Sequence, residues 1–200
     1  MRIIGLTGGI ASGKSTVSHR LHDRYGAVIL DADEAAYRIA EPEAPLWRLF
    51  VERYGKKKAL NEDGTLNRAA IGAIIFAKPE ERAWLDAASH PLVKEELSKK
   101  LKECKKNGVE TVVLDVPLLY EVGWDDMADS VWVVYVSPET QLKRLIARND
   151  LTEQLARDRI ASQMPLAEKK EKADVVIDND GDLELTNAQI DEAWEQEICK

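Results

Sequence analysis

Five short apolar runs stand out along the chain, separated by longer stretches in which apolar and polar residues recur at helical spacing. The runs cover residues 3–7, 27–30, 111–116, 131–136 and 175–177. The last three are rich in β-branched residues without polar alternation, which is typical of parallel strands covered on both faces. The pattern therefore predicts an α/β fold with a five-stranded parallel sheet and helices on both sides.

Several of the intervening stretches carry helix-end signals. Ser137 followed by Pro138 predicts an N-cap and first helical residue, opening a helix that runs through about Asn149. Gly108 predicts the end of a long helix that begins near Pro91, with His90 as its cap.

Two segments depart from the regular alternation of strands and helices. Residues 34–108 contain no convincing strand and are far longer than a usual crossover of about a dozen residues. Amphipathic pieces at 46–51 and 69–76 predict a helical insertion, which either forms a substrate pocket or only elaborates the packing. Residues 150–172 are charged with helical spacing, at a position where small-molecule kinases often carry a mobile lid.

A phosphate-binding pattern follows the first apolar run. Residues 8–15 read Gly-Gly-Ile-Ala-Ser-Gly-Lys-Ser and fit the P-loop pattern, with a strand before it and a helix after it. Glycines let the backbone N–H groups turn toward a phosphate, and the helix dipole adds to this attraction. Lys14 can reach the terminal phosphates, and the Ser15 hydroxyl can bind Mg²⁺. We therefore predict that the chain binds a nucleoside triphosphate.

Acidic residues follow two of the predicted strands. Asp31 and Asp33 come after the second strand, at the edge where ligands bind in open α/β sheets. We expect Asp33 to accept the proton of the phosphoryl acceptor, and Asp31 to cap the following helix over residues 34–40. Capping is also the alternative role for Asp33. Asp115 ends the third strand, and either supports Mg²⁺ or is a buried acid bound by backbone N–H groups.

Two arginines share one face of the helix that follows Ser137. Arg144 and Arg148 are spaced i, i+4 and could clamp the transferring phosphoryl group or the nucleotide base. The alternative for any single arginine is an ordinary surface position.

Composition narrows the class of partner. The chain has 200 residues, 44% hydrophobic content and a net charge of -8, which suit one domain with an insertion and make a general nucleic-acid surface unexpected. Cys104 and Cys199 have neither metal-ligand nor disulfide-framework spacing, and no apolar stretch is long enough to span a bilayer. We expect a cytoplasmic protein without nucleic-acid or membrane partners, and the oligomeric state is left open.

Together these segments resemble the dephospho-coenzyme A kinase family. The resemblance is carried by residues 5–16, 31–33, 90–93, 115–121, 141–148 and 173–179. The P-loop alone is shared by many families, whereas the segments in this order are much more specific. The chain departs slightly at Asn149-Asp150, where an acidic residue is expected first.

The resemblance implies that ATP phosphorylates the ribose 3′-hydroxyl of dephospho-coenzyme A, the last step of coenzyme A synthesis, with Mg²⁺ as cofactor. It implies one kinase domain with a nucleotide-binding core (about 1–33, 109–149 and 173–200), a helical coenzyme A-binding insertion (about 34–108) and a lid (about 150–172). Two alternatives stay open: another small-metabolite or nucleotide kinase, and a non-catalytic nucleotide switch. The absence of guanine-reading and switch motifs argues against the second alternative.

The resemblance also implies a role for individual residues. It implies that Asp33 and Lys14 are catalytic residues and that Ser15 and Asp115 contact Mg²⁺. The ATP contacts come from Gly9, Ile10, Ala11, Ser12, Gly13, Lys14, Ser15, Thr16, Arg144 and Arg148. The acceptor contacts come from Thr7, Asp33, His90 and Leu118.

Overall fold

Five strands form the sheet that the apolar runs predict. The computed structural model describes residues 1–198, so Cys199 lies outside the described residues. The strands are β1 (Arg2–Gly8), β2 (Val28–Asp31), β3 (Thr111–Asp115), β4 (Ser130–Tyr135) and β5 (Val175–Asp178). Each lies within one or two residues of its predicted bounds, because an apolar strand between two polar helices is bounded sharply in sequence.

The strand that leads into the P-loop lies at the centre of the sheet, whose order is β2-β3-β1-β4-β5. The β1 strand pairs in parallel with β3 and β4, and β4 pairs in parallel with β5. Gly8, the last residue of β1, lies level with Val134 of β4, and Leu6 lies level with Asp115 of β3. The P-loop therefore leaves the sheet between the carboxyl ends of two neighbouring strands.

The helices follow the predicted alternation with the strands. They are α1 (Lys14–Tyr25), α2 (Ala32–Arg38), α3 (Pro45–Tyr54), α4 (Lys56–Ala59), α5 (Arg68–Ala77), α6 (Pro79–Lys106), α7 (Pro138–Asn149), α8 (Glu153–Ala161), α9 (Leu166–Lys172) and α10 (Leu183–Ile198), with a 3₁₀ turn at η1 (Asp125–Met127). The predicted cap of α7 is confirmed, because the Ser137 side chain accepts a hydrogen bond from the backbone N–H of Thr140.

The predicted start of the long helix is wrong. Helix α6 begins at Pro79, so Pro91 lies inside it and His90 does not cap it. An internal proline removes a backbone hydrogen bond and costs about 3 kcal/mol. Packing along the helix offsets this cost, because Trp84 is held in an aromatic cluster before Pro91 while Val93 and Leu97 are buried after it. The predicted end is confirmed: the helix stops at Lys106, and Gly108 has a φ of 72°.

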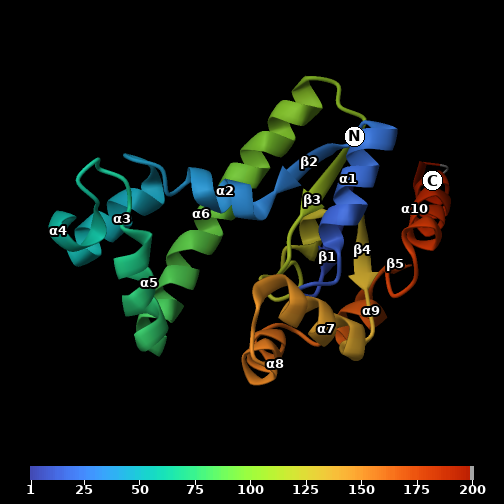
Figure 1. The fold of residues 1–200 in the computed structure, drawn as a ribbon. Coiled ribbons are helices and arrows are strands. Elements are labelled where there is room, and N and C mark those ends of the chain that lie inside the picture. The colour runs from blue at the N-terminus through green and yellow to red at the C-terminus, as the bar shows by residue number, and fades with distance from the viewer. Residues whose placement is uncertain (199–200) are drawn as a thin grey trace. The chain divides into compact units, whose positions relative to one another are not determined.

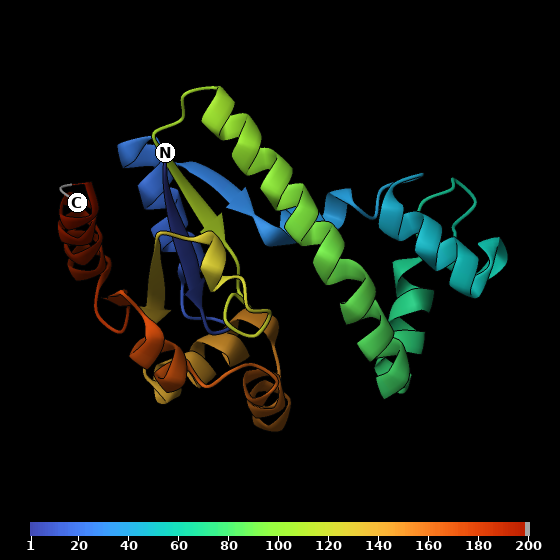
Figure 2. The same ribbon diagram turned by 180° about the vertical axis from the view of Figure 1, so that it is seen from behind.

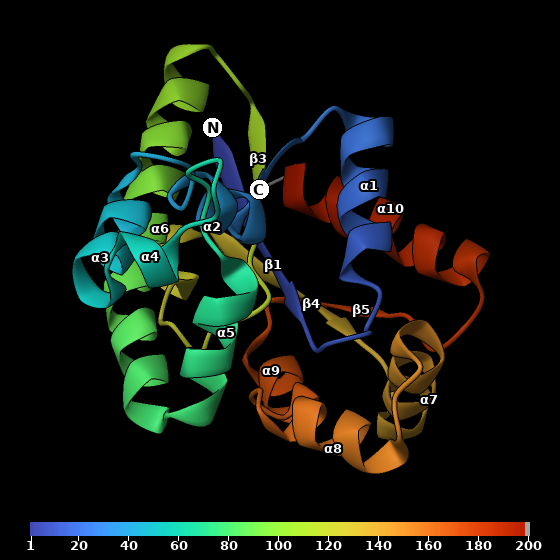
Figure 3. The same ribbon diagram turned by 60° about the vertical axis from the view of Figure 1, so that its left-hand side comes forward.

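The chain divides into two compact units, Met1–Ile29 with Lys105–Lys200, and Leu30–Cys104. In the first unit, α1 lies in front of the strands in Figure 1 and behind them in Figure 2, so it covers one face of the sheet. Figure 3 shows α7, α8 and α9 gathered beyond the end of the sheet where β1 and β4 finish. The hydrophobic core between the sheet, α1 and α10 includes Ile4, Leu6, Leu21, Trp132 and Ile190.

The second unit is helical, as the pattern of residues 34–108 predicts. Figure 1 shows α5 beside the first part of α6. Trp84 of α6 meets Phe50 and Tyr54 of α3 edge-on, with ring centroids 5.6 and 5.8 Å away. The Arg53 guanidinium lies 4.4 Å from the centre of the Trp84 ring and forms an ion pair of 2.7 Å with Glu81. This aromatic cluster joins α3 to α6. Across the described part of the chain, every helix is too short or too polar to cross a membrane.

Candidate active site

The P-loop connects the central strand β1 to helix α1 through a turn that only small residues allow. Gly13 is the N-cap of α1 and has a φ of 92°, in the left-handed region that favours glycine. Its carbonyl accepts a hydrogen bond of 2.9 Å from the N–H of Thr16, and the N–H of Ser12 donates to the Gly9 carbonyl at 3.1 Å. Ala11 also has a positive φ, 61°, although it carries a Cβ.

Close packing around the loop explains its glycines. A Cβ on Gly8 would lie 2.9 Å from the backbone oxygen of Val134, a Cβ on Gly9 would overlap the amide of Gln141, and a Cβ on Gly13 would overlap the amide of Asn179. The loop is therefore held against β4, α7 and the segment after β5.

Asn179 fixes the start of helix α1 and was not singled out from the sequence. Its side-chain N–H donates to the Ser12 carbonyl at 2.8 Å, and its side-chain oxygen accepts from the Thr186 hydroxyl at 3.0 Å. Asn179 is buried, and both ends of its amide are bonded within the protein, which indicates a structural role. The signal available in the sequence was its position directly after the β-branched strand β5.

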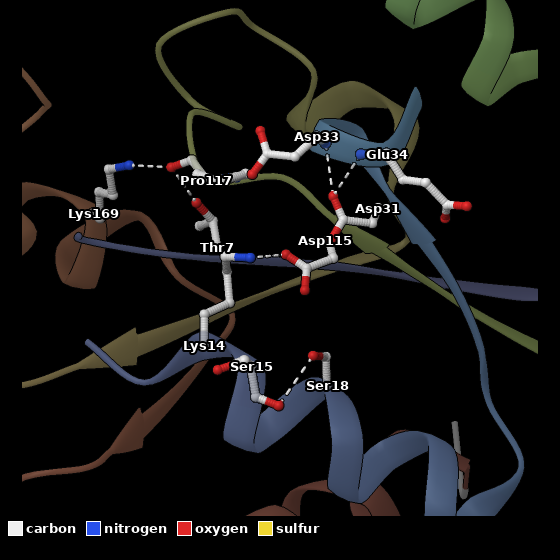
Figure 4. Close-up of polar contacts among 10 residues, drawn as sticks. All are labelled: Thr7, Lys14, Ser15, Ser18, Asp31, Asp33, Glu34, Asp115, Pro117 and Lys169. Atoms are coloured by element: carbon white, nitrogen blue, oxygen red, sulfur yellow. Dashed lines mark hydrogen bonds and ion pairs between the residues drawn. The ribbon is translucent and has the colours of Figure 1, made fainter. Parts of the chain in front are cut away.

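Lys14 and Asp115 form an ion pair at the phosphate loop (Figure 4). Asp115 is the last residue of β3, and its side chain is 4% exposed, against 18% for Lys14. The Lys14 ammonium is therefore the cation that balances this buried carboxylate. The sequence left two roles for Asp115, support of Mg²⁺ or binding by backbone N–H groups. The structure shows a further interaction, with a side chain of the P-loop itself.

The residues predicted to hold Mg²⁺ fit an ion that arrives with a nucleotide. Ser15 lies exposed in the first turn of α1, and its backbone carbonyl accepts a hydrogen bond from the Ser18 hydroxyl (Figure 4). The described residues contain no cluster of three or more His, Cys, Asp or Glu side chains that could bind a metal alone. Mg²⁺ usually takes one or two protein oxygens and completes its shell with phosphates and water. A hydroxyl and one carboxylate suit that chemistry.

A buried lysine braces the segment after β3. The Nζ atom of Lys169 in α9 donates to the Pro117 carbonyl at 2.8 Å and pairs with Glu121 at 2.8 Å, and the Thr7 hydroxyl donates to the same carbonyl at 3.1 Å (Figure 4). The Lys169 side chain is completely buried, and this burial lowers its pKa. Leu118, a predicted acceptor contact, follows directly after the braced carbonyl and is partly exposed.

Sequence reasoning missed Lys169 because it lies in the charged stretch 168–172, where one buried lysine cannot be told from its exposed neighbours.

The two predicted arginines differ in their surroundings. Arg144 of α7 donates to the Asn179 backbone carbonyl at 2.9 Å and so belongs to the surroundings of the P-loop. Arg148 lies one turn later, is exposed, and donates to the side chain of Asn149 at 2.9 Å. The structure therefore brings Arg144, but not Arg148, to the loop.

In the second unit, Asp31 caps helix α2 as predicted. Its side chain accepts hydrogen bonds from the N–H groups of Asp33 at 2.7 Å and Glu34 at 3.2 Å (Figure 4). The helix begins at Ala32, slightly earlier than predicted, so Asp33 lies in its first turn and is exposed. His90 lies within α6, with its Nε2 atom 4.0 Å from Asp86.

A P-loop at the carboxyl end of the central strand of a five-stranded parallel sheet, with a lysine over the loop and an acid on the next strand, defines a P-loop kinase. The family model of dephospho-CoA kinase matches residues 2–184, and the chain belongs to this family.

Known relatives agree with this assignment. The chain is 48% identical over 194 residues to the dephospho-CoA kinase of Symbiobacterium thermophilum, covering 97% of this chain and 80% of the relative. The crystal structure of TT1252 from Thermus thermophilus has a TM-score of 0.82 at 31% identity, covering 98% of this chain and 97% of that one. Dephospho-CoA kinase from Campylobacter jejuni has a TM-score of 0.74 at 25% identity, with the same coverage.

Proposed function

We propose that the protein transfers the γ-phosphoryl group of ATP to the 3′-hydroxyl of dephospho-coenzyme A, giving coenzyme A and ADP. The match of the dephospho-CoA kinase family model to residues 2–184 carries this proposal. The P-loop and the Lys14–Asp115 pair supply the phosphate chemistry that the reaction needs.

The nucleotide is held by residues 9–16. The N–H of Thr16 donates to Gly13, but the N–H groups of Lys14 and Ser15 at the start of α1 have no acceptor within the helix and are available to phosphate oxygens. Lys14 moves from its carboxylate partner toward the terminal phosphates as these arrive, and Arg144 contributes a second cation. Arg148 is the candidate for a further contact with the nucleotide. Ser15 and Asp115 would hold Mg²⁺, which would supply positive charge to the phosphates.

Asp33 is the general base in this proposal. It follows the end of β2 by two residues, and ligands in open α/β sheets bind beyond the carboxyl ends of the strands. The acceptor oxygen forms a bond to the γ-phosphorus while the bond from that phosphorus to the β–γ bridging oxygen breaks. The hydroxyl proton passes to the Asp33 carboxylate, and ADP leaves with the electron pair of the broken bond.

The acceptor is bound by the helical insertion together with residues of the core. We assign acceptor contacts to Thr7, His90 and Leu118. Lys169 fixes the Pro117 carbonyl, which accepts a hydrogen bond from Thr7 and directly precedes Leu118. Both residues are therefore held in place. Residues 150–172 act as the lid that excludes water during transfer.

An acceptor screen tests the proposal. ADP release is followed by a coupled assay with dephospho-coenzyme A, adenylate, other nucleoside monophosphates, shikimate, and no acceptor. We expect strong stimulation by dephospho-coenzyme A alone, with the product identified by mass and by the position of the new phosphate. Preference for adenylate or shikimate would replace the proposal with another small-molecule kinase activity. ADP release that ignores every acceptor would indicate an ATPase or a nucleotide switch.

A further inference from the structure

Two glutamine side chains hold one residue of the P-loop from opposite sides. The N–H of Ile10 donates to the side-chain oxygen of Gln163 at 2.8 Å. The carbonyl of Ile10 accepts from the side-chain N–H of Gln141 at 2.9 Å. Gln141 comes from α7 and is buried, whereas Gln163 comes from the short connection between α8 and α9. We call this pair the glutamine clamp.

The residue that follows the clamped one has a strained backbone. Ala11 has a φ of 61°, a left-handed conformation that its Cβ makes unfavourable. Such conformations persist where the surroundings impose them. Here both backbone polar groups of the preceding residue are fixed by side chains from elsewhere in the fold, so the chain enters Ala11 with its direction already set.

The clamp also explains why the residue before Ile10 has no side chain. A Cβ on Gly9 would overlap the amide of Gln141. Gly9 therefore provides the space that Gln141 needs to reach the Ile10 carbonyl.

From these contacts we infer that Gln141 and Gln163 are positioning residues that hold the strained Ala11 turn of the P-loop in its nucleotide-binding shape before the nucleotide arrives. The inference rests on the proposed nucleotide binding at this loop but not on the identity of the acceptor. Binding then costs less ordering of the loop, because the clamp has already fixed it.

Neutral amides suit this position beside a phosphate site. An amide oxygen accepts the Ile10 N–H without adding negative charge, whereas a carboxylate would repel the polyphosphate. The clamp acts on Ile10, so the N–H groups of Lys14 and Ser15 at the start of α1 stay available to the phosphates.

The clamp ties the lid to the nucleotide site. The N–H of Met164, the residue after Gln163, donates to the carboxylate of Glu121 at 2.9 Å. Two consecutive residues of the α8–α9 connection are thus docked, one on the P-loop and one on the segment after β3. Movement of α8 that pulled on this connection would release the Ile10 N–H and loosen the loop.

The test is a comparison of nucleotide affinities in two backgrounds. Dissociation constants for a non-hydrolysable ATP analogue are measured for the wild type, Gln163→Ala, Ala11→Gly, and the double variant. Loss of one hydrogen bond predicts about three- to tenfold weaker binding for Gln163→Ala. Glycine adopts positive φ freely, so in the Ala11→Gly background the same replacement should weaken binding by less than about twofold.

Matched controls separate positioning from general damage. Gln154→Ala removes an exposed glutamine of α8 that bonds only within its helix, to Asp158, and should leave nucleotide affinity unchanged. Gln141→Met keeps a neutral side chain of similar length but loses the N–H donor, and should weaken nucleotide binding without changing the dissociation constant of dephospho-coenzyme A. Thermal unfolding of each variant confirms that it is folded.

An equal penalty for Gln163→Ala in both backgrounds would overturn the inference in favour of direct contact between Gln163 and the nucleotide. Unchanged affinity in Gln163→Ala would overturn it as well. A wild type that binds the ATP analogue but phosphorylates another acceptor would refute the proposed function and leave the clamp standing. A wild type that does not bind the analogue would refute both.

Discussion

The Lys14 side chain has two roles, because it pairs with Asp115 as well as lying at the phosphate loop. Its ammonium neutralises a buried carboxylate in the free protein and serves the phosphates of the nucleotide in the proposed reaction. Removing Lys14 should affect stability through Asp115 and turnover through the nucleotide phosphates, so the two effects can be separated.

Lys14→Ala should lower turnover by at least a thousandfold, because positioned positive charge stabilises the transferring phosphoryl group. It should also lower the free energy of unfolding by about 2 kcal/mol, since the buried Asp115 carboxylate loses its bond to the lysine ammonium. The measurements are ADP release and urea denaturation. Adding Asp115→Asn should restore most of the stability and none of the turnover; a double variant as unstable as Lys14→Ala would show that the carboxylate is not the cause.

Asp33→Asn should lower turnover by about a hundredfold or more while ATP still binds, because the amide keeps the size of the side chain but cannot accept the proton. Steady-state assays with separate nucleotide-binding measurements check this. Asp31→Asn is the matched control, since asparagine caps a helix about as well as aspartate. A nearly normal Asp33 variant beside an inactive Asp31 variant would identify Asp31 as the base.

At the scale of elements, single polar contacts dock whole helices of the first unit. Lys169 joins α9 to the segment after β3, and Asp191 joins α10 to α1 by accepting hydrogen bonds from Arg20 at 2.6 and 2.8 Å and from Tyr25 at 2.7 Å. Each contact supports an element that carries part of the site.

Lys169→Met should lower the free energy of unfolding by about 2 kcal/mol, less than the loss from a fully buried ion pair because Glu121 is partly exposed. Thermal melting should show a fall of roughly 4–8 °C. Glu171→Gln, which removes an exposed charge of the same helix, should have little effect on the melting temperature. If both variants melt alike, burial of the Lys169 ion pair is not what stabilises α9.

Acid titration should reveal the α1–α10 contact. The hydrogen bond from Arg20, and then those from its other partners, lower the pKa of Asp191 to about 2, well below its ordinary value of 3.8. Because the folded pKa is the lower one, this stabilisation is complete above about pH 4 and is lost as the pH falls toward 2.

The contribution of Asp191 is about 1 kcal/mol after allowance for its partial exposure. Urea denaturation at pH 6, 4, 3 and 2 should therefore show a shallower loss of stability for Asp191→Asn than for the wild type. The neighbouring exposed substitution Glu192→Gln should follow the wild-type curve. Parallel curves for the wild type and Asp191→Asn would contradict the assignment.

At the scale of the whole molecule, the stretch predicted as a lid has two parts with different attachments. In α8, Ala156 is the buried residue, and Arg157 pairs with Glu153 of the same helix. In α9, Leu166 and Lys169 are buried and α9 packs on β4. We therefore expect lid movement in α8 and the residues that precede it, whereas α9 packs on the core.

Hydrogen exchange should separate these two parts. In the free protein, the amides of α8 should exchange faster than those of α9, because fewer buried contacts oppose opening. Binding of a non-hydrolysable ATP analogue with dephospho-coenzyme A should slow exchange in α8 and leave α9 nearly unchanged. Equal exchange in α8 with and without both ligands would make it an ordinary surface helix.

The fold and the phosphate loop could be predicted because their signals are local. Apolar runs mark the strands, and the residue types at 8–15 are dictated by phosphate binding. The cap at Asp31 follows from the same kind of local rule. Lys169, Gln163 and Asn179 could not be assigned because their partners lie far away in the chain, and a lone polar residue in a polar stretch indicates only exposure. The start of α6 was misplaced because a local proline rule was outweighed by tertiary packing.

The ion pair at the phosphate loop has a consequence for anion selectivity. The Lys14 ammonium is already paired with the Asp115 carboxylate. Any anion that binds Lys14 must therefore compete with a carboxylate that belongs to the same chain. Chloride or a single inorganic phosphate brings less charge than a triphosphate to this competition, and the net charge of -8 also disfavours the approach of such ions. A triphosphate that carries a divalent cation can replace both partners of the ion pair, since its phosphates can bind the Lys14 ammonium while its cation binds the Asp115 carboxylate. We therefore expect the common small anions to bind the free protein more weakly than a nucleoside triphosphate with its divalent cation.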